Sequence, residues 1–209
     1  MDYWAIADAE RTAYADLCDS MTPAQWDTPS LCDGWKVRDV VAHVNDGNDL
    51  KLGRALLTLA KYGFRLNTML QREAQKQGTQ ATEQLASAMR ASIGSRSLPP
   101  GTKPIDLPVE YIVHQQDVRR AIGIPRSYPA DTMRAALDRL SGMGNAILPG
   151  KKRAHGLHLR ATDLDWEHGE GDEVSGPGEA LLLAMAGRDV ALADLQGQGL
   201  ETLKSRLAH

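Results

Sequence analysis

Two side chains that can share a metal ion lie four residues apart in segment 108–123. Glu110 offers a carboxylate and His114 an imidazole, and in an α-helix this spacing places both groups on one face. A carboxylate and an imidazole in that arrangement can bind one divalent cation. The same spacing also allows a metal-free pair in which the two buried side chains hydrogen-bond to each other. The motif alone leaves both interpretations open.

The residues around this pair indicate that it faces the protein interior. At 100° per residue, Asp117 continues the polar row that Glu110 and His114 begin. Apolar side chains border the row on both sides: Val109, Val113, Tyr111 and Val118. Polar groups that face an interior must be paired, protonated or bound to a ligand. We therefore expect this row to bind something or to be internally paired.

A third ligand is offered by the helix expected to begin at Val37. Its apolar stripe is formed by four valines: Val37, Val40, Val41 and Val44. His43 lies about 110° from the centre of this stripe, at the edge of the core. That position suits a ligand pointing into a cleft, and it equally suits a half-exposed structural histidine.

The three candidate ligands would meet only if their two helices pack side by side, as they do in an antiparallel bundle. His43, Glu110 and His114 would then supply two imidazoles and one carboxylate. Three protein ligands with a fourth, open position are typical of catalytic zinc sites. The long separation of His43 from Glu110 in the sequence is not informative by itself.

Helical periodicity dominates the chain as far as residue 148. It predicts helices over residues 2–20, 37–63, 64–78, 79–94, 108–123 and 131–148. Beyond the breaker pair Pro149-Gly150 and three basic residues, Leu157, Leu159 and Ala161 alternate with polar residues, which predicts a strand. Further short strands are expected at 164–166 and 173–175, and helices at 180–186 and 199–207. The expected fold class is α+β and mainly α, with a helical bundle at 1–148 and a small α+β domain at 154–209.

Composition excludes several classes of function. The 209 residues carry a net charge of −3, which gives no electrostatic case for binding nucleic acid or an anionic membrane. No apolar run approaches the roughly 20 residues of a membrane span, and the N-terminus lacks the pattern of a secretory signal. Cys18 and Cys32 form no CxxC motif, and we expect Cys32 to be buried and inert rather than a thiol facing the cleft. These features favour a cytoplasmic protein whose partners are small molecules. We expect a monomer or a homodimer, and the sequence does not distinguish between the two.

Three blocks of sequence, taken in order, resemble the mycothiol-dependent maleylpyruvate isomerase family. Residues 28–44, TPSLCDGWKVRDVVAHV, are similar to the family signature that leads into the second helix of a DinB-like bundle. EYIVHQQDVRRAIG resembles the second signature, E-x-x-x-H-x-x-D-x-x-x-A-x-G. LHLRATDLDWEHG and VSGPGEALLLAMAGR are similar to the small C-terminal domain of some members. Lys36 stands where the family often has a small hydroxyl residue, so that a helix N-cap is lost.

The resemblance implies a DinB-like up-and-down helical bundle with a metal site. His43, Glu110 and His114 match the residues that bind zinc or another divalent ion in the family. Asp117 matches an aspartate that orients a ligand imidazole from outside the coordination sphere. Arg188 matches the arginine of the C-terminal Gly-Arg and would have a catalytic role by pairing with an anionic substrate.

The function implied by the resemblance is that of a metal-dependent enzyme with mycothiol as co-substrate. Zinc, or another divalent ion, would lower the pKa of the thiol, and the thiolate would add to an electrophilic carbon. The outcome would be isomerisation of a maleylpyruvate-like substrate, or S-transfer to an electrophile by a transferase reaction. Two alternatives stay open at this point. One is a non-catalytic metal-binding stress or regulatory protein, and the other is a structural bundle in which Glu110 and His114 pair internally.

Overall fold

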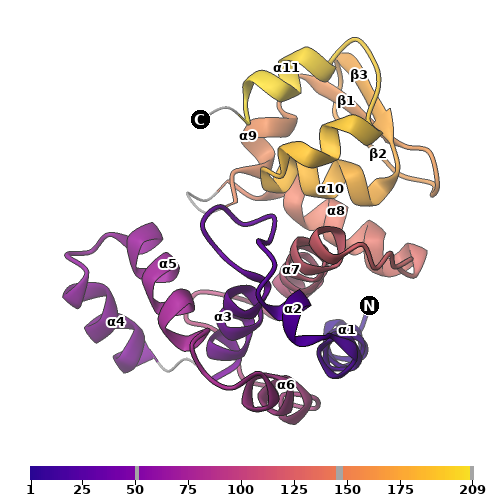
Figure 1. Ribbon diagram of the computed structural model, residues 1–209. Helices are drawn as coiled ribbons and strands as arrows, with labels where there is room; N and C mark the ends of the chain where they lie inside the picture. Colours follow the sequence, from indigo (N-terminus) through magenta and orange to yellow (C-terminus); the bar gives the residue numbers. More distant parts are fainter. Residues whose placement is uncertain (50–51, 145–147, 208–209) are drawn as a thin grey trace. The chain divides into compact units, whose positions relative to one another are not determined.

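The chain folds into two compact units, Met1–Arg126 and Ser127–His209, which Figure 1 shows in a computed structural model. The structure describes residues 1–49, 52–144 and 148–207. The first unit is helical, and the second combines helices with a small sheet. The predicted fold class, a DinB-like helical bundle followed by a small α+β part, is confirmed.

Four helices of the first unit form the bundle. Helices α1 and α3 each pack against both α6 and α7, whereas α5 packs on α3, and α4 packs on α5. The described elements of this unit are α1 (Tyr3–Ser20), α2 (Pro23–Trp26), α3 (Val37–Asp49), α4 (Leu52–Lys61), α5 (Leu66–Gln77), α6 (Thr82–Ala91), the 3₁₀ helix η1 (Pro104–Asp106) and α7 (Leu107–Ile122).

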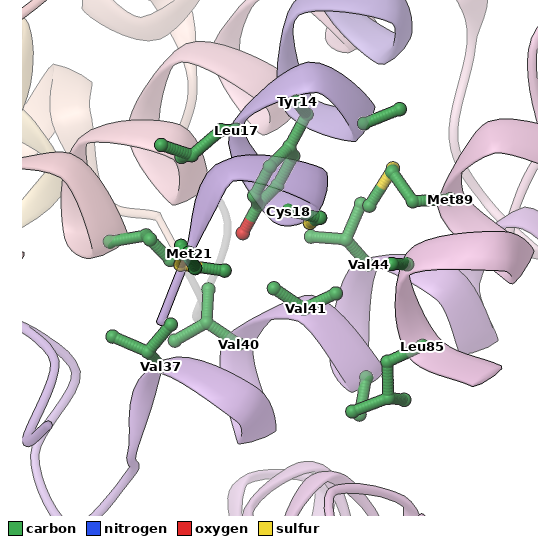
Figure 2. Packing of buried hydrophobic residues seen from close by; sticks show 14 of the residues in the cluster. Tyr14, Leu17, Cys18, Met21, Val37, Val40, Val41, Val44, Leu85 and Met89 are labelled. Atoms are coloured by element: carbon green, nitrogen blue, oxygen red, sulfur yellow. The ribbon is translucent and has the colours of Figure 1, made fainter. Parts of the chain in front are cut away.

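The valine stripe of α3 lies at the centre of the bundle core. Figure 2 shows these valines facing side chains of α1 and α6, among them Tyr14, Leu17 and Met89. Val37, Val40, Val41 and Val44 are all buried. Valine has a weak helix propensity, so burial of this stripe is what stabilises α3. A firmly buried stripe also fixes the rotation of α3 and therefore the direction of His43.

Helix α3 begins without a hydroxyl cap, as expected from Lys36. The carboxylate of Asp39 takes over part of that role, since its Oδ2 accepts a hydrogen bond of 2.9 Å from the backbone N–H of Lys36. The segment 37–63, predicted as one helix, is described as α3 (Val37–Asp49) and α4 (Leu52–Lys61), so the helical structure ends two residues earlier than predicted. The link between them, residues 50–51, lies outside the described residues.

Helix α4 is the least buried helix of the first unit. None of its residues is buried, and three of its leucines, Leu52, Leu56 and Leu57, are 61%, 55% and 76% exposed. Across the described residues, every helix is too short or too polar to cross a membrane.

The second unit is built around a three-stranded sheet with the order β2–β1–β3. Strand β1 pairs antiparallel with β2 and parallel with β3, with Leu159 opposite His168 and Val174. Helix α10 packs against α8 and η2. The described elements are α8 (Ala130–Gly142), α9 (Gly150–Ala154), β1 (Leu157–Ala161), β2 (Glu167–His168), β3 (Asp172–Gly176), α10 (Gly178–Ala186), the 3₁₀ helix η2 (Asp189–Asp194) and α11 (Leu200–Ser205).

Helix α8 differs from the expectation in its length and in its partners. It ends at Gly142 rather than continuing to 148, because the chain turns back and Lys151 N donates to Met143 O at 2.8 Å. Residues 145–147, the last part of the predicted helix, lie outside the described residues. Its contacts with α9 and α10 place α8 in the second unit. The compact units divide after Arg126, and the expected domain boundary between 1–148 and 154–209 stays a prediction.

Candidate metal centre

Helix α7 presents Glu110, His114 and Asp117 on one face, as their spacing predicted. The side chains become less exposed along the helix, from 39% for Glu110 to 13% for His114 and 0% for Asp117. The predicted flanking residues of the row are buried: Val109, Tyr111, Val113 and Val118. The row therefore runs from solvent into the core, with its donor groups reachable from the Glu110 end.

Helix α3 brings His43 to the same place. Its packing against α7 sets His43 Nε2 at 4.0 Å from Glu110 Oε1, and His114 Nε2 lies 3.6 Å from the same oxygen. The two imidazole rings meet edge to face, with centroids 5.1 Å apart. His43 is 22% exposed, which matches its predicted position at the edge of the core.

The spacing of these three groups can be compared with both interpretations of the motif. An internal hydrogen-bonded pair would need an N···O distance near 2.9 Å, and both distances to Glu110 are longer. Ligands about 2.0–2.1 Å from a tetrahedral zinc ion lie roughly 3.3 Å from one another. One ligand atom from each of the three residues lies within 4.8 Å of the other two. The donor set and its spacing therefore fit a single divalent cation.

Asp117 fixes the orientation of the His114 ring. Its Oδ2 lies 3.0 Å from His114 Nδ1, so that Nε2 points toward Glu110. Burial disfavours the charged imidazole, but the carboxylate of Glu110 and hydrogen bonds with Asp117 and Cys32 outweigh it and raise the pKa of His114 to about 10. In the metal-free protein, a proton on His114 therefore supplies positive charge next to the carboxylates of Glu110 and Asp117.

Cys32 also belongs to this cluster, which the sequence did not predict. It is only half-buried, and its Sγ donates a hydrogen bond of 3.0 Å to Asp117 Oδ2. The backbone N–H of Leu31 donates to Asp117 O at 3.1 Å, which ties this loop to α7. The thiol is therefore less buried than expected, and its inertness stays a prediction. Its place in the block CDGW was the signal that could have found it.

Trp35 comes from the same loop and lies against His43. The ring centroids are 5.1 Å apart at an interplanar angle of 51°. The indole thereby limits the rotamers open to His43 and supplies an apolar wall beside its imidazole. Sequence reasoning matched Trp35 to a family signature without giving it a role.

Arg188, the other predicted site residue, belongs to the second unit. It precedes η2 and its Nη1 donates to Ala186 O at 2.9 Å. The structure thus brings together His43, Glu110, His114 and Asp117 within the first unit. The catalytic role of Arg188 stays a prediction.

Comparison with known families agrees with the sequence resemblance. Residues 7–98, which include α1, α3 and His43, match the family described as the mycothiol maleylpyruvate isomerase N-terminal domain. This segment, a little under half of the chain, is similar to that family. The matched segment stops before α7, so the metal-binding roles of Glu110 and His114 stay predictions that rest on the geometry and the second signature.

Two solved structures share the fold over nearly the whole chain. The crystal structure of a mycothiol-dependent maleylpyruvate isomerase aligns with a TM-score of 0.61 at 16% identity, covering 94% of this chain and 91% of that one. A histidine-to-alanine mutant of such an isomerase aligns over the same shares, with a TM-score of 0.59 at 13% identity. No curated protein matches the sequence significantly. At these identities, the likeness establishes the fold.

Proposed function

We propose that the protein is a divalent-metal-dependent enzyme that uses mycothiol to isomerise a maleylpyruvate-like substrate. In this proposal His43, Glu110 and His114 bind one cation, zinc being the foremost candidate, and Asp117 orients His114. Neither Cys18 nor Cys32 forms a disulfide, which suits a reducing cytoplasm, where we place the enzyme.

The observation that carries the proposal is the convergence of three lone-pair donors from two helices. Glu110 Oε1 lies 3.6 Å and 4.0 Å from the two imidazole nitrogens, too far for hydrogen bonds and suitable for a shared cation. A purely structural pair would close these distances. The family match of residues 7–98 and the fold shared with a mycothiol-dependent isomerase support a thiol as the molecule bound next to such a cation.

A bound divalent cation would lower the pKa of a coordinated thiol and so supply a thiolate near neutral pH. The chain's own contribution is to hold the ligands in place. Asp117 accepts a hydrogen bond from His114 Nδ1–H and thereby keeps the lone pair of Nε2 available for the cation. Trp35 limits the rotation of His43, and the exposed edge of Glu110 leaves an approach for the substrate.

Reaction with a maleylpyruvate-like substrate follows from addition of the thiolate sulfur to the carbon–carbon double bond. The carbon–carbon bond of the adduct is single and can rotate, and elimination of the thiol then restores the double bond in the other geometry. If the adduct is retained, the same addition is an S-transfer. Arg188 is our candidate for pairing with a carboxylate of the substrate.

The experiment combines metal analysis with a thiol assay on one set of variants. Purified protein is loaded with Zn²⁺, dialysed, analysed for metal, and assayed with mycothiol and maleylpyruvate, and with mycothiol and a panel of electrophiles. We expect about one equivalent of metal, and thiol-dependent turnover that is lost in Glu110→Gln and His114→Ala. His155→Ala is the matched control, since His155 is exposed and lies in the second unit.

Each alternative has its own outcome in this experiment. Stoichiometric metal with no thiol-dependent turnover would contradict the enzymatic proposal and favour a metal-binding regulatory protein. Protein without specific metal would favour the structural interpretation of the cluster. Turnover with the electrophile panel but not with maleylpyruvate would assign S-transfer in place of isomerisation.

A further inference from the structure

A second group of ligand atoms lies on the other side of the His114 ring. Cys32, Asp117 and His114 each offer one ligand atom, and these atoms lie within 4.8 Å of one another. Two separations are 3.0 Å, from Asp117 Oδ2 to Cys32 Sγ and from Asp117 Oδ2 to His114 Nδ1. A thiolate, a carboxylate and an imidazole are the three side-chain types that bind zinc-like cations in proteins.

The two groups differ in the kind of cation that they suit. The group formed by His43, Glu110 and His114 offers only nitrogen and oxygen, whereas Cys32 gives the other group a sulfur atom. Thiolate ligands favour soft cations, and imidazole and carboxylate favour harder ones. The two groups of ligands, on opposite sides of the His114 ring, are therefore expected to prefer different cations.

We propose that Cys32, Asp117 and His114 form a second cation site, specific for a thiophilic ion such as Cd²⁺. This site and the one formed by His43 and Glu110 compete for the single imidazole that they share.

The competition follows from the number of lone pairs on the ring. A neutral imidazole has one lone pair and one N–H. A cation beside His43 and Glu110 takes the lone pair of Nε2, and the proton on Nδ1 then stays hydrogen-bonded to Asp117 Oδ2. A cation beside Cys32 takes the lone pair of Nδ1, and the remaining proton sits on Nε2, facing Glu110. In the second case Cys32 releases its thiol proton to solvent.

The loop before α3 holds Cys32 in place for this role. Ser30 Oγ accepts a 3.1 Å hydrogen bond from Cys32 N, and Cys32 O accepts a 3.0 Å bond from Trp35 N. The turn between them uses the left-handed conformation of Gly34, at φ 74°. Because the loop is also bound to α7 through Leu31 N, the thiol needs no rearrangement of the backbone to approach the ring.

Burial of Asp117 strengthens the case for a cation. Its side chain is 0% exposed, and a buried carboxylate needs compensating positive charge or hydrogen-bond donors. In the metal-free protein, the Cys32 thiol and the His114 ring provide the donors. A cation bound between all three replaces those hydrogen bonds and keeps the carboxylate neutralised.

The test is a titration of metal-free protein with Cd²⁺ alone, followed by ultraviolet absorption from sulfur-to-cadmium charge transfer. We expect a band that saturates at about one equivalent in the wild type and persists in His43→Gln, which alters only the other group. We expect no band in Cys32→Ser. Cys18→Ala is the matched thiol control and should retain the band, because Cys18 lies in the core cluster.

A second measurement on the wild type guards against a variant that fails to fold. Cd²⁺ should slow alkylation of Cys32 by iodoacetamide by at least about tenfold, because a coordinated thiolate is a poor nucleophile, and Mg²⁺ should not. Pre-loading with Cd²⁺ should also weaken Co²⁺ binding in the wild type.

Three results would overturn the inference: no charge-transfer band in the wild type, a band that survives in Cys32→Ser, or a band lost in His43→Gln. The inference does not rest on the proposed enzymatic activity. A protein without thiol-dependent turnover could still show the cadmium site, and an active enzyme could lack it, so the two failures are distinguishable.

Discussion

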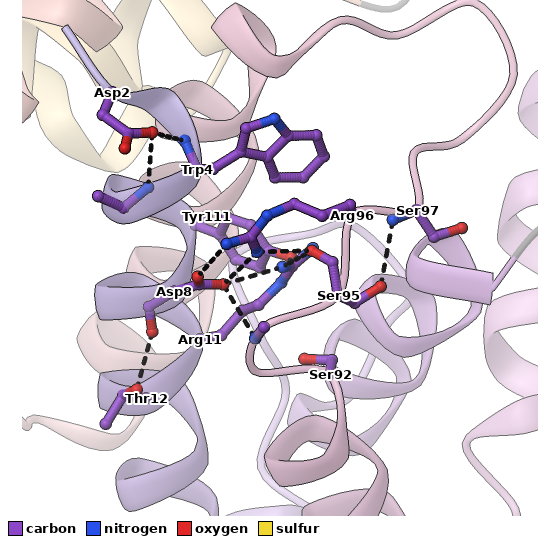
Figure 3. A network of polar contacts seen from close by, with 12 residues as sticks. Asp2, Trp4, Asp8, Arg11, Thr12, Ser92, Ser95, Arg96, Ser97 and Tyr111 are labelled. Carbon is purple, nitrogen blue, oxygen red and sulfur yellow. Dashed lines mark hydrogen bonds and ion pairs between the residues drawn. The ribbon is translucent and has the colours of Figure 1, made fainter.

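Two successive residues of α7, Glu110 and Tyr111, each belong to a polar cluster. The clusters differ in whether their polar groups are paired at hydrogen-bond distance. The first surrounds Arg11, whose side chain is fully buried (Figure 3). Its Nε donates to the Tyr111 hydroxyl at 2.6 Å and its Nη1 to Ser95 O at 2.7 Å, and the guanidinium carbon lies 5.4 Å from the centre of the Tyr111 ring. Donors and acceptors are matched at hydrogen-bond distance, so this cluster holds α1, α7 and the segment after α6 together.

In the second cluster, neither His43 nor His114 reaches the Glu110 carboxylate at hydrogen-bond distance. The carboxylate faces two imidazole nitrogens at 3.6 Å and 4.0 Å, and a proton on His114 satisfies it only in part. A complete network stabilises the fold, whereas an incomplete one has room for a ligand. The comparison predicts that substitutions in the two clusters will affect different properties.

The largest effect should come from removing a ligand of the incomplete cluster. We expect His114→Ala to weaken metal binding by at least about 1,000-fold, or about 4 kcal/mol. Loss of a residue outside the coordination sphere already costs about 10–100-fold, and a direct ligand should cost more. Competition with a chromophoric chelator measures this change. Metal affinity within tenfold of the wild type would remove His114 from the site.

Removing the centre of the complete cluster should instead affect folding. We expect Arg11→Met to lower the free energy of unfolding by about 3 kcal/mol, because Tyr111 and Ser95 lose their buried partner. Urea denaturation of the metal-free proteins measures the loss. Arg96→Met is the control: that side chain is 52% exposed, so its ion pair with Asp8 should contribute less than about 1 kcal/mol. An equal loss in both variants would contradict the contrast between the clusters.

The pH dependence of metal binding sharpens the comparison further. The pKa of His114 in the folded protein is raised to about 10, above the ordinary histidine pKa of about 6.5. Protonation of His114 therefore stabilises the metal-free fold fully below about pH 6.5. This stabilisation is lost as the pH rises through 10. Metal must displace that proton, so affinity should rise about tenfold for each pH unit, or about 100-fold from pH 6 to pH 8. A flat profile over this range, measured by calorimetry, would contradict the protonated state of the cluster.

A smaller effect is expected from the residue that orients His114. Asp117→Asn keeps the size of the side chain but weakens the bond to His114 Nδ1, and should reduce metal affinity by about tenfold. The same chelator competition measures it. If the affinity is unchanged, Asp117 plays no part in orienting the ligand.

The sequence predicts the part of this site that lies on one helix, and not the part that depends on tertiary packing. Glu110 and His114 share one helix, so their spacing alone places them together. His43 reaches them only because α3 packs on α7, and that packing could be anticipated from the family resemblance but not from the distance along the chain. The position of Cys32 next to Asp117 was not predicted, because it depends on a turn at Gly34 and on hydrogen bonds to α7. The periodicity of apolar residues gives no information on either.

The same reasoning applies to the fold. The periodicity of the valines predicted α3, and the two-residue alternation predicted β1. The end of α8 at Gly142 could not be predicted, since it depends on the chain folding back near Met143. The assignment of α8 to the second unit likewise depends on its contacts with α10, which are tertiary.

The central claim is that His43, Glu110 and His114 bind one divalent cation. The most direct measurement is the location of the ion by anomalous diffraction from crystals of the zinc-loaded protein. We predict one peak about 2.0–2.2 Å from a nitrogen of each histidine and from an oxygen of Glu110. A zinc-loaded crystal with no peak among these three side chains would contradict the account.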